Sequence, residues 1–104
     1  MPIQQKLSEE EILEEIKDIP LWDYKNPYII REIVATNFVA AIGIVNAIAI
    51  LSEKTDHHPD ILIYGWNKIR ITLITHSINA LSKLDLLFIL KIDFEAIFNL
   101  PSFK

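Results

Sequence analysis

The stretch NFVAAIGIVNAIAILSEK, residues 37–54, decides the fold that we predict from this sequence. Asn37 is a residue type that caps helix N-termini, and apolar side chains follow it at helical spacing from Phe38 to Leu51. Both sides of the expected helix over residues 38–54 are almost equally apolar, which is typical of a helix buried on more than one side. We therefore expect this segment to be the central helix of a packed domain.

Short extended segments flank this helix in two pairs. They are rich in β-branched and aromatic residues, and a turn separates the members of each pair, at Asn26-Pro27 before the helix and at Asn67-Lys68 after it. The predicted strands cover residues 22–24, 28–36, 61–66 and 69–75. In the last strand one face carries Ile69, Ile71 and Leu73, and the other carries Arg70, Thr72, Ile74 and His76.

Capping boxes mark two further helices. Ser8 and Glu11 have this spacing at the start of a predicted helix over residues 8–18, and Ser82 and Asp85 have it at the start of one over residues 82–97. The element order is therefore α-β-β-α-β-β-α. We predict one α+β domain over residues 1–104, a four-stranded antiparallel sheet with helices packed on one face. The other face carries polar residues and is free for a ligand or a second subunit.

The composition argues against several classes of protein. The net charge is −4, and the ten basic residues are scattered among fourteen acidic ones, so we expect no nucleic-acid partner. The absence of cysteine excludes disulfides and thiolate metal sites. The most apolar run, residues 38–51, is about 14 residues long and falls short of the roughly 20 of a membrane helix, so no membrane partner is expected.

The chain is unusually apolar for its size. Hydrophobic residues make up 51%, and the mean hydropathy is +0.27. A small domain buries only part of its surface, so this excess indicates a subunit interface, and we expect a homo-oligomer. The N-terminal residues MPIQQK lack the apolar region of a signal peptide, which favours a cytoplasmic protein.

All three histidines, His57, His58 and His76, fall within residues 57–76. Imidazole is the side chain that gains or loses a proton near neutral pH, so this window is the candidate site for acid–base chemistry. Three interpretations are open at this point: surface histidines without a common function, a metal site with three imidazole ligands, or metal-free acid–base catalysis on an organic ligand. Adjacent histidines reach one small ion only through a strained loop, which weighs against the metal site.

Four segments carry a resemblance to a known family. They are EKTDHHPD at residues 53–60, YGWNK at 64–68, LITHS at 73–77 and LSKLD at 81–85. Together they resemble the pterin-4a-carbinolamine dehydratases, with the detailed match running from about Glu53 to Asp93. The resemblance implies a lyase of tetrahydrobiopterin recycling that dehydrates 4a-hydroxytetrahydropterins to quinonoid dihydropterin. The pterin is then the substrate, no cofactor or metal is needed, and a homodimer or homotetramer is expected.

The resemblance also implies roles for individual residues. His57 would be the principal acid/base catalyst, and His58 and His76 would hold the pterin and assist proton transfer. Asp85 would orient a histidine, although the N3 position of a capping box favours a carboxylate in any case, and both explanations can hold together. The substrate-contacting residues would be Asp56, His57, His58, Pro59, Thr75, His76, Ser77 and Ile78.

One position departs from the family pattern. Members commonly carry Gly-Gly where this chain has Asn79-Ala80, and if those glycines have positive φ, Asn tolerates the conformation better than Ala. Some relatives of this fold act instead as dimerisation cofactors of transcription factors or as assembly proteins, and some of these lack the histidines. A non-catalytic binding or assembly module is therefore the alternative function, and retention of all three histidines favours the enzyme.

Overall fold

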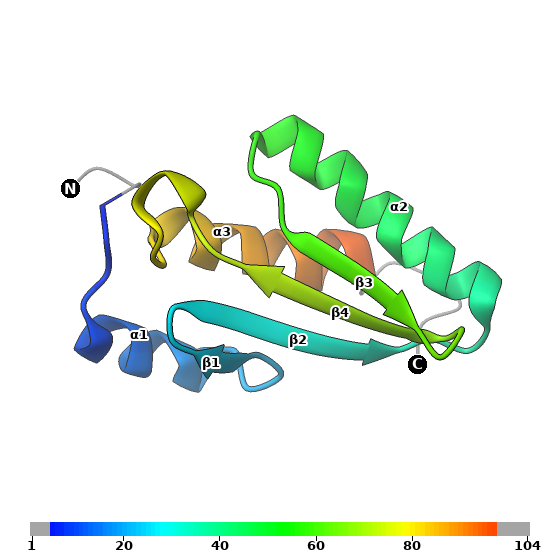
Figure 1. Ribbon diagram of the computed structural model, residues 1–104, viewed down its shortest axis with the longest axis horizontal. Coiled ribbons are helices and arrows are strands. Elements are labelled where there is room, and N and C mark those ends of the chain that lie inside the picture. The colour runs from blue at the N-terminus through cyan, green and yellow to red at the C-terminus, as the bar shows by residue number, and fades with distance from the viewer. Residues whose placement is uncertain (1–4, 98–104) are drawn as a thin grey trace.

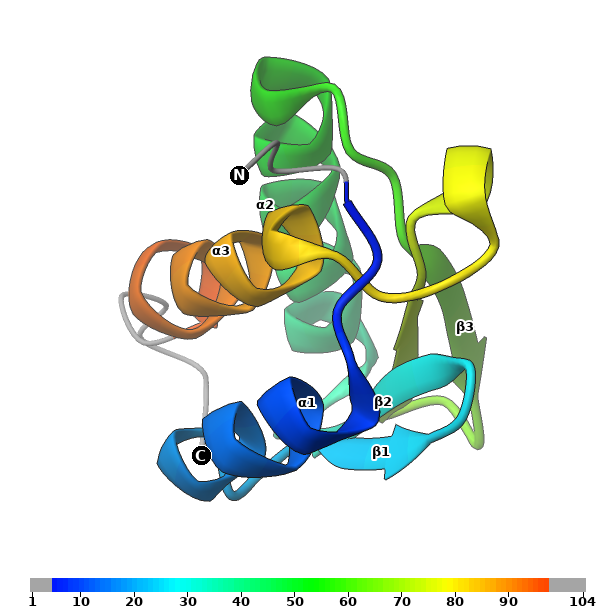
Figure 2. The same cartoon turned by 90° about the vertical axis from the view of Figure 1, so that its left-hand side faces the viewer.

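The structure is a computed structural model that describes residues 5–97. Its four strands form one antiparallel sheet in the order β1-β2-β4-β3, and the helices cover one face of it (Figure 1; Figure 2). This arrangement confirms the predicted α+β fold and the element order α-β-β-α-β-β-α. The elements are α1 (Glu9–Glu15), the 3-10 turn η1 (Ile16–Asp18), β1 (Asp23–Lys25), β2 (Tyr28–Val34), α2 (Phe38–Thr55), β3 (Asp60–Tyr64), β4 (Lys68–Leu73), the 3-10 turn η2 (His76–Ile78), α3 (Lys83–Lys91) and the π-helix η3 (Ile92–Ile97).

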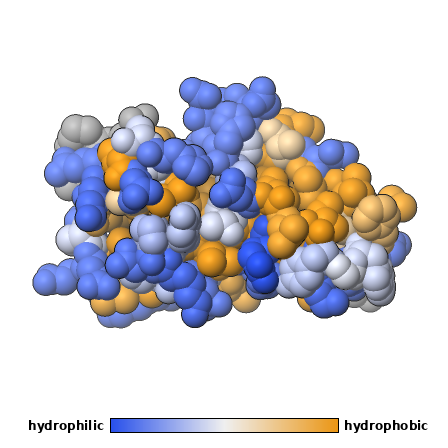
Figure 3. All heavy atoms as spheres, in the orientation of Figure 1, coloured by the Kyte–Doolittle hydropathy of each residue, from blue (hydrophilic) through white to orange (hydrophobic). Residues whose placement is uncertain are grey.

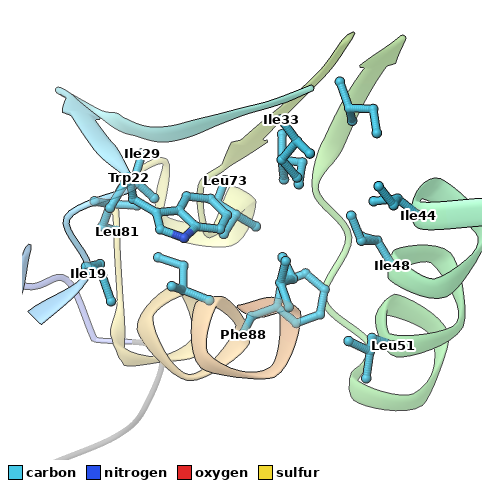
Figure 4. Close-up of a cluster of buried hydrophobic side chains, with 14 of the residues drawn as sticks. Ile19, Trp22, Ile29, Ile33, Ile44, Ile48, Leu51, Leu73, Leu81 and Phe88 are labelled. Carbon is cyan, nitrogen blue, oxygen red and sulfur yellow. The ribbon is translucent and has the colours of Figure 1, made fainter. Parts of the chain in front are cut away.

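Alternation along the central strands builds the core. Ile29 and Ile33 of β2 and Leu73 of β4 point toward the helices, as do their neighbours Ile69 and Ile71, and all five are 3% exposed or less. From the other side, α2 contributes Ile44, Ile48 and Leu51, and α3 contributes Phe88 (Figure 4). The core therefore lies between the sheet and the α2–α3 layer, as the apolar pattern of these segments predicts.

The central helix begins and ends where its sequence indicates. The Asn37 side chain accepts a hydrogen bond from the Ala40 amide at 2.7 Å, and Asp56 ends the helix with φ 52°. At 18 residues and a hydropathy of 1.5, α2 is long and apolar enough to meet the criteria for a membrane span, but the buried side of the same helix supplies the core. The left-handed Asp56 turns the chain sharply, and His57 follows directly.

The predicted turn between the last two strands is wrong. Tyr64 pairs with Lys68, so the connection is Gly65-Trp66-Asn67 and not Asn67-Lys68. Gly65 and Trp66 have φ values of 54° and 61°, and glycine supplies such a conformation without steric cost. Trp66, predicted to end a strand, lies at the hairpin tip with 61% of its surface exposed.

Strand β4 also ends earlier than predicted, at Leu73. Ile74 is 3% exposed and does not share the outer face with Arg70 and Thr72. Its neighbour Thr75 forms an isolated antiparallel bridge with Ala80, which folds the chain back through η2. The change of direction at the strand end therefore comes from a tight loop that closes on itself.

Polar and apolar side chains both occupy the outer face of the sheet, which the helices leave uncovered. The Tyr64 hydroxyl and the Arg70 Nε donate to the two carboxylate oxygens of Glu32 at 2.7 and 2.6 Å, and the bond from Arg70 holds the pKa of Glu32 below its usual range. An apolar region lies over β3 in the view of Figure 3, and Leu62 of this strand is 48% exposed. This face thus carries the expected polar residues together with apolar ones.

The last predicted helix changes type along its length. The α-helical part ends at Lys91, and residues Ile92–Ile97 continue as a π-helix. Asp93 of this segment accepts hydrogen bonds from Arg31 of β2 and from the Trp22 indole. Arg31 points into the core side of the sheet and is 6% exposed, so its charge depends on Asp93 for compensation.

Replacing Asp93 should therefore destabilise the fold. In Asp93→Ala the Arg31 guanidinium loses its carboxylate partner while it remains buried, and we expect the unfolding free energy in urea to fall by about 2–3 kcal/mol. The control is Glu14→Ala, which removes the exposed Lys17–Glu14 pair and should change stability by less than about 0.5 kcal/mol. Equal effects of the two substitutions would contradict this role of Asp93.

Candidate active site

The two adjacent histidines point in opposite directions from the end of α2. His57 is buried, at 8% exposed, and its amide donates to the Ser52 carbonyl at 3.2 Å. His58 is exposed, and Pro59 behind it is half-buried. After the reversal at Asp56, one imidazole faces the protein interior and the other faces solvent.

The buried histidine forms a pair with Asp85 of α3. His57 Nε2 lies 2.7 Å from Asp85 Oδ1, and the carboxylate is fully buried. The Phe88 ring meets the imidazole edge-on, with 5.4 Å between centroids and 90° between planes. A small pocket of about 110 Å³, lined by Leu84, Leu87, Phe88 and Lys91 among others, borders the ring. Asp85 also accepts the Ser82 amide at 2.9 Å as the N3 residue of the capping box. Both contacts expected for Asp85 are therefore present.

Three further hydrogen bonds connect this carboxylate with Thr75 and with the helix cap Ser82. The Thr75 hydroxyl donates to Asp85 Oδ2 at 2.7 Å and lies 2.7 Å from the Ser82 hydroxyl. Ser82 in turn accepts the Leu84 amide at 3.2 Å. Thr75, predicted as a substrate contact, is 4% exposed, and its side chain faces Asp85. The Thr75 hydroxyl is therefore directed into the protein and not toward a ligand, and its backbone N–H and C=O are bonded to Ala80.

The exposed histidines have different surroundings. His58 Nε2 lies 2.6 Å from Glu53 Oε2, and both side chains are more than half exposed. His76 opens η2 and is exposed, as is Ser77, while Ile78 is half-buried. The loop after α2 and the η2 turn lie next to each other at one end of the sheet (Figure 1; Figure 2). The two segments expected to line a substrate site are thus at the same end of the molecule.

The three imidazoles are not placed as ligands of one metal ion. Among residues 5–97, no group of three or more His, Asp or Glu side chains is placed so that it could hold a metal ion. His57 is committed to Asp85 inside the protein, whereas His58 is paired with Glu53 at the surface. The geometry therefore gives the three-imidazole interpretation no support.

The loop beyond His76 explains the Asn79-Ala80 pair. Asn79 has φ 50°, in the left-handed region, and Ala80 does not have a positive φ. Asparagine is the residue after glycine that tolerates this conformation best, so the chain keeps the loop without glycine. Ala80 is buried and bonds to Thr75 through the bridge, where a small side chain is sufficient.

A family model described as "Pterin 4 alpha carbinolamine dehydratase" matches residues 5–94. The chain belongs to this family. A relative in Nitrosospira multiformis, provisionally named a pterin-4-alpha-carbinolamine dehydratase, is 38% identical over 87 residues, which cover 84% of this chain and 76% of the relative. A protein of Chloroflexus aurantiacus with the same provisional name is 41% identical over 80 residues, 77% of this chain and 85% of the relative. The resemblance inferred from the sequence is therefore confirmed.

Solved structures agree with the assignment to the pterin carbinolamine dehydratase family. The crystal structure of a protein of Brucella melitensis titled a transcriptional coactivator/pterin dehydratase has a TM-score of 0.81 at 30% identity, covering 88% of this chain and 99% of that one. A pterin dehydratase-like protein identified as a RuBisCO assembly factor in the alpha-carboxysome shares the fold, with a TM-score of 0.56 at 23% identity over 69% of this chain and 82% of that one. The family fold thus occurs in proteins described by more than one function.

Sequence reasoning missed two members of the buried cluster. The hydroxyl of Ser82 was expected only as a helix cap, and Phe88 was not singled out from the sequence, yet Ser82 contacts Thr75 and Phe88 packs on His57. The capping-box spacing could have suggested the role of Ser82, because it places Ser82 next to Asp85, and Asp85 was expected to orient a histidine. Trp22, in the first predicted strand, is 3% exposed, and its indole donates to Asp93, so it packs inside the protein.

The conformations of Asn79 and Ala80 predict different responses to substitution by glycine. Asn79→Gly keeps a left-handed residue in place and should change the unfolding free energy by less than about 0.5 kcal/mol. Ala80→Gly adds backbone freedom to the unfolded chain without relieving strain and should cost about 0.5–1 kcal/mol. Chemical denaturation of the two variants measures the difference, and stabilisation by Ala80→Gly would contradict the loop geometry described above.

Proposed function

We propose that this protein is a 4a-hydroxytetrahydropterin dehydratase, a hydro-lyase that releases water and quinonoid dihydropterin by histidine acid–base catalysis. Its membership of the family and the provisional names of its relatives support the reaction class. The observation that carries the proposal is the set of three imidazoles at one end of the sheet, one held by a buried carboxylate and two facing solvent. The cytoplasmic location expected from the sequence stays a prediction.

The reaction needs only proton transfers. An imidazolium donates a proton to the C4a hydroxyl, the C4a–O bond breaks, and water leaves. A neutral imidazole removes the N5 proton, and the electron pair of that N–H bond forms the N5–C4a double bond. One proton is donated and one is accepted, so the protein ends the cycle with its net protonation unchanged.

The residues divide these tasks by their surroundings. We assign His57 the principal acid–base role, because Asp85 and Phe88 fix its ring and a fixed imidazole transfers protons in a defined direction. His58 and His76 are exposed, and we assign them to hold the pterin from two sides. Contacts to the substrate from Asp56, Pro59, Ser77 and Ile78 are part of the same proposal. No cofactor enters it, since the pterin is the substrate.

Substitution of His57 tests this assignment. His57→Ala should lower kcat for a synthetic 4a-hydroxytetrahydropterin by roughly 10²- to 10⁴-fold and change KM much less, because the group transfers a proton and does not hold the ligand. The spontaneous dehydration rate is subtracted, and Glu14→Gln on the exposed surface of α1 serves as the control. Wild-type rates in His57→Ala would overturn the role of His57.

Measurements on the wild-type protein distinguish the dehydratase from a non-catalytic module and from a metal enzyme. A non-catalytic module of this fold would show no turnover in the wild type and no saturable binding of a dihydropterin, and it would retain a protein partner in a pull-down. A metal enzyme would contain stoichiometric metal by elemental analysis and would lose activity with a chelator. Turnover by a protein that contains no stoichiometric metal is the result that we expect.

We also propose that the protein is a homo-oligomer formed through α2. Five exposed residues follow one another at alternating spacings of three and four along this helix, the pattern of a helix–helix seam: Val39, Ile42, Asn46, Ala49 and Glu53. Asn46 lies seven positions from each end of this row. A second copy packed antiparallel would place the two Asn46 amides opposite each other, where each can donate and accept a hydrogen bond.

A charge in this row should break the assembly. Val39 is 79% exposed in the single chain, so Val39→Glu can reduce the mass measured by size exclusion with light scattering without disturbing the core. Leu13→Glu, at a 48% exposed position of α1, is the matched control and should leave the mass unchanged. A wild type that is monomeric at micromolar concentration would rule out this interface.

A further inference from the structure

The side chain of Thr75 lies at the centre of the buried cluster and not at its surface. The hydroxyl is 2.7 Å from Asp85 Oδ2 and 2.7 Å from Ser82 Oγ, and the residue is 4% exposed. Its neighbour His76 is exposed. Consecutive residues of the strand end therefore serve the two sides of the candidate site, one inside the protein and one facing solvent.

Counting protons fixes the direction of these hydrogen bonds. A threonine hydroxyl has one proton, and a carboxylate can only accept, so Thr75 donates to Asp85. The contact between Ser82 and Thr75 must then be donated by Ser82, whose oxygen is left to accept the Leu84 amide. The hydrogen bonds run in one direction, from the start of α3 through Ser82 and Thr75 to Asp85.

This order determines which oxygen is left for the histidine. Oδ2 of Asp85 receives both the Thr75 hydroxyl and the Ser82 amide, and Oδ1 receives His57 Nε2. An acceptor-only carboxylate requires a hydrogen on that ring nitrogen. In the neutral imidazole, the lone pair is then on Nδ1, and this is the atom that can take a proton from a substrate.

We propose that Thr75 is a positioning residue for His57 that acts through Asp85, and that its side chain does not contact the substrate. The proposal rests on the proposed dehydratase function for its catalytic consequence only. Without the Thr75 hydroxyl, Oδ2 keeps only the Ser82 amide as a donor, and the carboxylate is held less firmly. The partner of His57 Nε2 is then less well fixed, and so is the direction of Nδ1.

Three variants separate this role from simple packing. Thr75→Val keeps the shape of the side chain and removes the donor, and Thr75→Ser restores the donor. Thr72→Val is the matched control, since it makes the same change on the half-buried outer face of β4, away from Asp85. Ring nitrogen NMR of ¹⁵N-histidine protein reports the protonated atom of His57 and the exchange of its proton with water, and it requires no activity.

In the wild type we expect the His57 proton on Nε2, in slow exchange with water. In Thr75→Val, exchange should be faster by about tenfold or more, and kcat should fall by roughly 10- to 100-fold with KM within about twofold. Thr75→Ser should return both values to within about threefold of the wild type, and Thr72→Val should change neither. This pattern would support the positioning role.

Other outcomes overturn the proposal. If His57 of the wild type carries its proton on Nδ1, the proposal is overturned. This measurement needs no variant, so it decides the question even if Thr75→Val fails to fold. A Thr75→Val enzyme with raised KM, unchanged kcat and an unchanged ring proton would show that Thr75 contacts the substrate instead. If the wild type does not dehydrate the pterin at all, the proposed function fails. The NMR comparison still decides whether Thr75 positions His57.

Discussion

Burial of the Asp85 carboxylate is the constraint on which the site depends. A charged group without solvent contact is costly unless each oxygen is hydrogen-bonded, so the chain has to bring donors to it. They come from three places that are distant in the sequence: the loop after α2 supplies His57, the end of β4 supplies Thr75, and the start of α3 supplies the Ser82 amide. Satisfying one carboxylate therefore joins the ends of three elements at the point where the candidate chemistry takes place.

The same constraint gives the three histidines different characters. Asp85 and Phe88 hold His57 on two sides, while His58 is paired with the exposed side chain of Glu53. A ring held in this way is suited to directed proton transfer, and an exposed ring can adapt to a bound ligand. The residue type alone does not distinguish the three imidazoles, and the fold gives them different surroundings.

Much of the architecture follows from local signals, because those signals act within a few residues. Asn37 and the two capping boxes mark helix starts, and alternation in the strands marks the buried face of the sheet. The hairpin tip was misplaced because Trp66 has strong strand propensity but occupies a left-handed position beside Gly65. The π-helix at Asp93 and the inward direction of Thr75 depend on Arg31 and Asp85, partners too far along the chain for any local pattern to indicate.

The two tryptophans end in opposite environments, and this gives the protein two separate optical reporters. Trp22 is 3% exposed and donates to Asp93, so its emission depends on whether the π-helical segment is docked against the sheet. Trp66 is 61% exposed at the hairpin tip, where a soluble quencher reaches it freely. Fluorescence quenching can therefore follow the docking of the π-helical segment and the environment of the β3–β4 tip in a single unlabelled sample.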